Sequence, residues 1–175
     1  FQYSIHVHRQ DGSTEHREYL HAGGGDPRRP LAEDLLADLG LEGSIVHYSA
    51  YERTQIDGLA GALPDLARGL AAVRTRLFDL EPVIRRNTRH PMAAGRSSIK
   101  YVLPAWCPDL SYADMGIGDG QTASARYLRI ARGLAEEAEA SATMRDLAEY
   151  CALDTYAMVR LLEEMMLLSR GAAGD

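Results

Sequence analysis

A carboxylate at the centre of an apolar helical stripe constrains the fold of this chain more than any other feature. The stretch EYCALDTYAMVRLLEEMM (149–166) places apolar residues three and four apart, as on the inward face of an amphipathic helix. Asp154 falls within this face, and Tyr150 precedes it by one turn on nearly the same side. A buried charge without a partner costs at least several kcal/mol, so the fold must give Asp154 a partner or a backbone group to cap.

Two interpretations of Asp154 follow from the sequence. In the first, one helix ends at Leu153 and Asp154 caps a second helix that starts at Thr155, since Asp is a favoured N-cap residue. In the second, Asp154 is a metal-binding carboxylate on a rigid helix, and Tyr150 points at the same site. The pattern Tyr-x-x-x-Asp is loose, and both interpretations stay open.

Glu52 is the second candidate site residue. It follows the predicted strand GSIVHYS (43–49) within a turn of the carboxyl end, where ligands bind in open α/β sheets. The same position also fits a capping box, Ser49-x-x-Glu52, in which the carboxylate would serve the backbone.

The periodicities predict an α/β chain with a single domain over residues 1–175. Residues 1–10 alternate strictly, Asp11-Gly12 gives a turn, and residues 13–20 return as a second strand, which together indicate a hairpin. The order of elements favours a mixed sheet flanked by helices. The remaining predicted elements are helices at 26–40, 50–63, from 64, 97–106, 121–139 and 142–168, and strands at 43–49 and 77–84.

The net charge of −6 argues against a broad electrostatic nucleic-acid surface but leaves room for a small basic one. Such a cluster follows residue 84, and it either binds phosphates or forms a solvated surface. Its members are Arg85, Arg86, Arg89, Arg96 and Lys100. Two isolated cysteines indicate reduced core thiols and a cytoplasmic protein, and no stretch is apolar enough to span a membrane.

Several other polar residues are weaker candidates. His6 and His8 share a strand face and could bind a metal, although an exposed polar face is the simpler interpretation. Asp114 and Asp119 lie in a Gly-rich loop and either belong to a site or are solvated. The run Gly23–Gly25 precedes a helix but lacks the Lys-Ser/Thr of a phosphate-binding loop, which favours a flexible connection.

Taken in order, the segments HYSAYE (47–52) and YCALDT (150–155) resemble the DEDD group of 3′–5′ exonucleases, which have a ribonuclease-H-like fold. Tyr51-Glu52 is similar to the second acidic segment of that group, with Glu in place of the usual Asp. Tyr150 to Asp154 is similar to the third segment in its tyrosine form. More closely, the chain resembles a bacterial domain-of-unknown-function family, family 2779, which is thought to belong to this group. The stretches that carry this resemblance are FQYSIHVH, HREYL, GGDPRRPLAEDLL, GSIVHYSAYE, SSIKYVLPAW and YCALDT.

The resemblance implies a site with two divalent cations, Mg²⁺ or Mn²⁺, bound by Asp154 and Glu52, with Tyr150 orienting the attacking water. The first acidic segment, Asp-x-Glu on a central strand, is absent, so we expect further ligands upstream of Phe1 and an inactive fragment without them. The implied partner is a single-stranded end of DNA or RNA, with other domains of the same chain as further partners. The rival interpretation is a non-catalytic scaffold or interaction module of a larger nuclease or DNA-handling protein.

Overall fold

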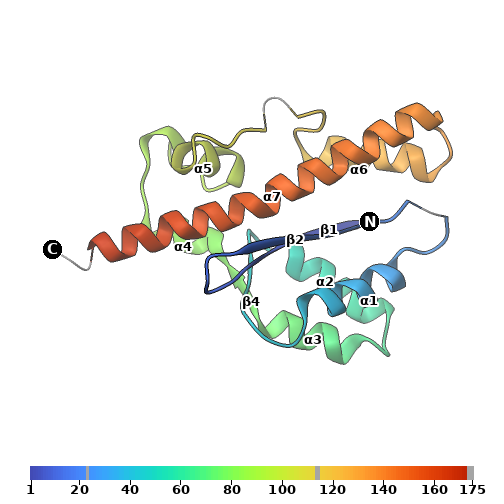
Figure 1. Ribbon diagram of the computed structural model, residues 1–175, viewed down its shortest axis with the longest axis horizontal. Coiled ribbons are helices and arrows are strands. Elements are labelled where there is room, and N and C mark those ends of the chain that lie inside the picture. The colour runs from blue at the N-terminus through green and yellow to red at the C-terminus, as the bar shows by residue number, and fades with distance from the viewer. Residues whose placement is uncertain (23, 113–114, 173–175) are drawn as a thin grey trace. The chain divides into compact units, whose positions relative to one another are not determined.

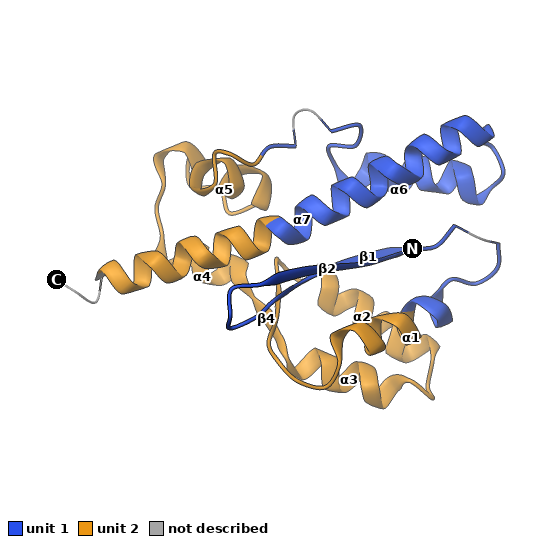
Figure 2. Ribbon diagram, in the orientation of Figure 1, with its two compact units in different colours: residues 1–31, 111–156 blue, residues 32–110, 157–175 orange. Residues whose placement is uncertain are grey.

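The structure, a computed structural model, describes residues 1–22, 24–112 and 115–172 (Figure 1). The chain forms two compact units, coloured separately in Figure 2. Unit 1 consists of Phe1–Leu31 and Ser111–Tyr156, and unit 2 consists of Ala32–Leu110 and Ala157–Asp175. Each unit therefore contains segments that are distant in the sequence.

Unit 1 begins with the hairpin that the alternating sequence predicted. Strands β1 (Gln2–His8) and β2 (Thr14–Leu20) pair antiparallel, with His6 opposite His16. The turn needs Gly12, whose φ of 82° lies in the left-handed region that glycine enters without strain. This part of the sequence prediction is confirmed.

The remainder of unit 1 is helical. Helix α6 spans Gly120–Ala131, and helix α7 spans Glu137–Ala172, of which the part up to Tyr156 belongs to unit 1. The predicted pair of helices is present, but the break between them lies at 132–136 instead of 140–141. Gly133 has a φ of 65° at this break, a conformation that ends a helix readily.

The polar face of β1 packs against α7 within unit 1. Gln2 donates a hydrogen bond to the carbonyl oxygen of Leu147 (3.1 Å), and the hydroxyls of Ser4 and Thr155 lie 2.8 Å apart. Nδ1 of His6 lies 2.8 Å from the same Thr155 hydroxyl. Two residues along a strand and four residues along a helix cover similar distances. Alternate residues of β1 can therefore contact successive turns of α7. The expected exposed face is therefore wrong for His6, whereas His8 is exposed and contacts Thr14.

Unit 2 contains a short parallel pair of strands, β3 (Ile45–His47) and β4 (Leu77–Asp79), in which His47 lies opposite Asp79. The predicted strand at 77–84 is shorter than expected, because Asp79 caps a helix that begins at Leu80. The helices are α1 (Arg28–Leu39), which starts in unit 1, α2 (Tyr51–Ala62), α3 (Ala67–Thr75), α4 (Leu80–Asn87), the 3₁₀ turn η1 (Pro91–Ala93), α5 (Ile99–Trp106) and the end of α7.

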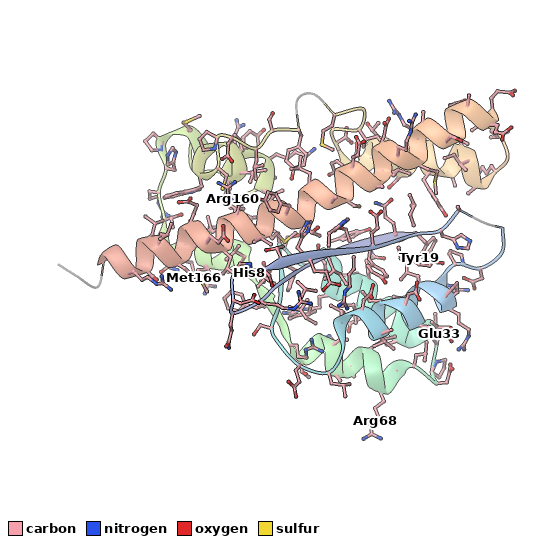
Figure 3. The ribbon with its side chains drawn as sticks, viewed as in Figure 1. His8, Tyr19, Glu33, Arg68, Arg160 and Met166 are labelled. Atoms are coloured by element: carbon pink, nitrogen blue, oxygen red, sulfur yellow. The ribbon has the colours of Figure 1, made fainter. Side chains whose placement is uncertain are left out.

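Apolar residues of several helices form the core of unit 2. Leu70, Leu103 and Leu161 are fully buried, and Leu80 is 1% exposed. The helix predicted from residue 64 is present as α3, and it buries Leu70 and Val73. Figure 3 shows Arg160 on α7. Its guanidinium pairs with Asp109 at 2.7 Å within the same unit.

The fold class is α/β, with more helix than strand. The hairpin and the parallel pair form two separate two-stranded sheets among the described residues, so a single ribonuclease-H-like mixed sheet is not confirmed. In the described part of the chain, no helix combines the length and apolar character needed to cross a membrane.

Candidate functional site

Asp154 lies in the interior of α7 and does not cap a helix. Helix α7 runs without interruption from Glu137 to Ala172, so the interpretation of Asp154 as an N-cap is wrong. Instead, the hydroxyl of Tyr112 donates a hydrogen bond of 2.7 Å to Oδ1 of Asp154. The carboxylate in the apolar stripe therefore has a charge-assisted hydrogen bond, which offsets part of its desolvation.

Tyr150 joins Tyr112 beside this carboxylate. The two tyrosine rings lie 5.9 Å apart between centroids, tilted by 48°. Burial, followed by the charge of Asp154, raises the pKa of both phenols well above the ordinary tyrosine range. Both tyrosines therefore stay protonated at neutral pH and are hydrogen-bond donors. We call Tyr112, Tyr150 and Asp154 the Asp154 cluster; all three belong to unit 1.

Glu52 lies in the first turn of α2, but not in a capping box. The helix begins at Tyr51, its N-cap is Ala50, and no side chain caps it, so Ser49 and Glu52 do not hold the positions that the motif requires. One oxygen of Glu52, Oε2, is turned inward and lies 3.5 Å from Nδ1 of His47. Burial raises the pKa of the Glu52 carboxyl, and the neighbouring His47 acts against this shift.

The backbone between His47 and Glu52 is held by the neighbouring strand. Ser49 has a φ of 73°, an uncommon conformation for a residue other than glycine. Its N–H donates a hydrogen bond of 2.9 Å to Oδ1 of Asp79, and the same oxygen accepts from the N–H of Glu81 at 3.1 Å. Asp79 thus joins the carboxyl ends of β3 and β4. We call His47, Glu52 and Asp79 the Glu52 cluster; all three belong to unit 2.

The structure brings Tyr150 and Asp154 together in unit 1 and places Glu52 in unit 2. Among the described residues, no group of three or more His, Cys, Asp or Glu side chains has the arrangement of a metal site. Asp154 and Glu52 do supply the carboxylate oxygens that Mg²⁺ and Mn²⁺ prefer. Oε2 of Glu52 is buried without a hydrogen-bond partner in the described part of the chain, whereas the Glu52 side chain as a whole is 37% exposed, which fits a carboxylate that a cation approaches from solvent.

The predicted phosphate-binding residues all lie on the exposed surface of unit 2. Arg85 pairs with Glu81 on α4 at 3.0 Å, and Arg89 donates to the carbonyl oxygens of Arg85 and Thr88. The guanidinium of Arg96 lies 4.3 Å above the ring of Tyr101. Arg86 and Lys100 are exposed as well.

The weaker candidates have plain structural roles or fall outside the described residues. Asp119 caps α6, because its Oδ1 accepts the N–H groups of Gln121 and Thr122 at 2.9 Å. Asp114 and Gly23 lie outside the described residues. Of the residues in the two clusters, Tyr112, His47 and Asp79 were missed by the sequence reasoning. The position of His47 at the end of a predicted strand was the available signal; Tyr112 sits in a loop and gave none.

Comparison with known proteins gives a family but no relative of known structure or curated function. The model of a domain of unknown function, DUF2779, matches residues 1–98, more than half of the 175 residues. No curated protein and no solved structure matches the chain. The matched segment includes the Glu52 cluster, while Tyr112, Tyr150 and Asp154 lie beyond it. On this match, the chain belongs to the DUF2779 family.

Proposed function

We propose that the chain is a metal-dependent nuclease domain related to the DEDD 3′–5′ exonucleases, acting on phosphodiester bonds of DNA or RNA. The observation that carries the proposal is the position of Asp154 inside a continuous helix, with Tyr150 one turn before it. Helix capping does not account for a carboxylate there. A metal-binding role accounts for both the carboxylate and the adjacent phenol.

Each proposed residue has a defined role. Asp154 and Glu52 bind divalent cations through carboxylate oxygens. The phenol of Tyr150, held protonated, donates a hydrogen bond that orients the attacking water. The cations supply Lewis acidity and charge neutralisation at the scissile phosphate. A single carboxylate in either unit is too few to hold a divalent cation, so the proposal includes further oxygen ligands for each of them.

The exposed basic cluster is proposed to bind the phosphates of the nucleic-acid backbone. It comprises Arg85, Arg86, Arg89, Arg96 and Lys100, and exposed cations of this kind neutralise phosphates and release counterions. Replacing Arg86 and Lys100 together by Gln is expected to reduce the slope of log affinity against log salt by about one to two. An unchanged slope would assign the cluster to the solvated surface.

The test is a Mn²⁺-dependent degradation assay with the full-length natural protein on 3′-labelled and 5′-labelled single-stranded DNA and RNA. Wild type is expected to shorten the substrate from its 3′ end. Asp154→Asn and Glu52→Gln are each expected to lower the rate at least about 100-fold, because the metal ligands are lost. Asp57→Asn and Glu139→Gln are matched controls, since these carboxylates form surface ion pairs with Arg74 and Arg129.

The scaffold interpretation is favoured by one specific observation, the hydrogen bond from Tyr112 to Asp154. If wild type leaves all four substrates intact and Asp154→Asn only changes stability, the carboxylate is structural. The domain would then be a non-catalytic module in a larger protein.

A further inference from the structure

Two buried polar groups face one another in the Glu52 cluster without completing a hydrogen bond. His47 is 2% exposed, and neither of its ring nitrogens has a hydrogen-bond partner among the described residues. Oε2 of Glu52 is likewise buried and has no partner there. Nδ1 and Oε2 lie 3.5 Å apart, beyond the usual length of an N–H···O hydrogen bond. A buried polar group without a hydrogen bond is unfavourable, so a small approach of one group to the other is favourable.

With Glu52 ionised and the ring of His47 neutral, one position of the ring proton is favoured. A neutral imidazole carries one N–H, on either Nδ1 or Nε2. With the proton on Nε2, the lone pair of Nδ1 faces a carboxylate oxygen and the buried N–H remains unsatisfied. With the proton on Nδ1, the ring donates to Oε2 and the carboxylate gains a charge-assisted hydrogen bond. The surroundings therefore select the Nδ1–H form.

We propose that His47 is the positioning residue for Glu52: its Nδ1–H holds Oε2 at the carboxyl end of β3 and fixes the orientation of the carboxylate. The His47 side is rigid, because the residue is buried and belongs to a paired strand. The side chain of Glu52 is 37% exposed, so a ligand can reach the rest of its carboxylate from solvent. Under the nuclease proposal, on which this role rests, the ligand is a divalent cation. A hydrogen-bond partner that orients a metal-binding side chain typically contributes about 10–100-fold to metal affinity.

The first arm of the test reads the ring of His47 directly and does not depend on activity. Long-range ¹H–¹⁵N correlation spectra of the full-length protein distinguish the Nδ1–H from the Nε2–H form of each histidine. Wild type is expected to show His47 as Nδ1–H, and Glu52→Leu is expected to remove this preference. His47 in the Nε2–H form in wild type, or an Nδ1–H form unaffected by Glu52→Leu, would overturn the proposal.

The second arm measures Mn²⁺ affinity by calorimetry for wild type, His47→Asn and His47→Leu. The amide N–H of Asn stands near the position of Nδ1–H, so His47→Asn is expected to stay within about threefold of wild type. His47→Leu removes the donor and is expected to weaken binding about 10–100-fold. Equal affinities for the Asn and Leu variants would contradict the positioning role. If wild type binds no Mn²⁺, the nuclease proposal fails, and the ring spectra alone decide the role of His47.

Discussion

The hydroxyl of Tyr112 donates a 2.7 Å hydrogen bond to Oδ1 of Asp154, across 42 residues of sequence. This bond joins the segment after α5 to the middle of α7 within unit 1. It gives the carboxylate in the apolar stripe a partner without a metal ion. A divalent cation and the Tyr112 hydroxyl are compatible partners, since each carboxylate oxygen has two lone pairs.

Removing this hydroxyl is expected to destabilise the protein. Tyr112→Phe removes the 2.7 Å hydrogen bond to a half-buried carboxylate, and we expect a loss of about 1–3 kcal/mol in the free energy of unfolding. Urea denaturation measures the loss. Tyr101→Phe is the matched control, because Tyr101 is 43% exposed and its ring still faces Arg96 after the change. Equal effects for the two variants would show that the Tyr112 bond adds nothing specific.

Arg76 holds the end of α1 and the loop that leads to β3. Its guanidinium donates to the carbonyl oxygens of Leu39 (2.9 Å), Gly40 (2.7 Å) and Gly43 (2.8 Å), and also of Glu42. Arg76→Lys keeps the charge but cannot reproduce this fork of donors, so we expect a loss of about 2 kcal/mol in urea denaturation.

Arg74→Lys provides the comparison for Arg76. Arg74 lies two residues earlier and pairs with Asp57 on the surface, where both side chains are nearly half exposed. Its replacement is expected to cost under about 0.5 kcal/mol. A loss at Arg76 no greater than the loss at Arg74 would contradict the structural role of these four bonds.

Gly116 has no room for a side chain. A Cβ at this position would lie 2.6 Å from Cγ of Asp146, whose carboxylate is held by Arg126 at 3.0 Å. Gly116→Ala therefore overlaps the carboxylate or displaces it from its partner, at an expected cost of about 1–3 kcal/mol. Gly120→Ala is the control, since nothing lies within 4 Å of a Cβ there.

A double-mutant cycle assigns the cost at Gly116 to its neighbour. Asp146→Ala removes the overlapping atoms, so Gly116→Ala is expected to cost much less in that background. Additive losses from the two substitutions would place the strain elsewhere in the loop.

Alkaline pH is expected to destabilise the fold through Cys151. Burial raises the pKa of this thiol from 9 to about 11, and Gln2 donates a hydrogen bond to its sulfur. Between these values the folded chain keeps the proton while the unfolded chain loses it. The contribution of this thiol to the free energy of unfolding is therefore fully present below about pH 9. It is lost as the pH rises toward 11, and the loss is at most about 3 kcal/mol.

Between pH 9 and 10 the unfolded chain also begins to lose protons from Cys107, Tyr112 and Tyr150, whose pKa values are likewise raised in the fold, so a variant must separate the contribution of Cys151 from theirs. Cys151→Ala is expected to flatten the slope of unfolding free energy against pH in this interval. The Cys107→Ala variant, which retains Cys151, is expected to keep that part of the slope. A slope unchanged by Cys151→Ala would show that the thiol does not titrate in this way.

Local patterns predicted the parts of the fold that local chemistry determines. Strict alternation and Asp11-Gly12 predicted the hairpin, and the helix predicted from residue 64 is present as α3. The pairing of β1 with α7 was not predictable in this way. Gln2, Ser4 and His6 look like a solvated face until the helix that covers them is known.

The site was predictable in its acidic residues but not in their partners. Asp154 stood out because a charge interrupts an apolar stripe, whereas Tyr112 lies in a loop with no periodicity to place it. The capping interpretations failed for a different reason. Asp154 and Glu52 fit local capping motifs, but α7 continues without a break past Asp154, and α2 begins at Tyr51.

The metal-binding role of Asp154 is best tested by anomalous X-ray scattering from crystals of the full-length protein grown with Mn²⁺. A Mn²⁺ peak is expected at coordination distance from a carboxylate oxygen of Asp154 and is expected to be absent in Asp154→Asn. Well-ordered density for Asp154 bound to Tyr112, with no Mn²⁺ peak beside it at millimolar metal, would rule out metal binding by Asp154 and assign the carboxylate a structural role.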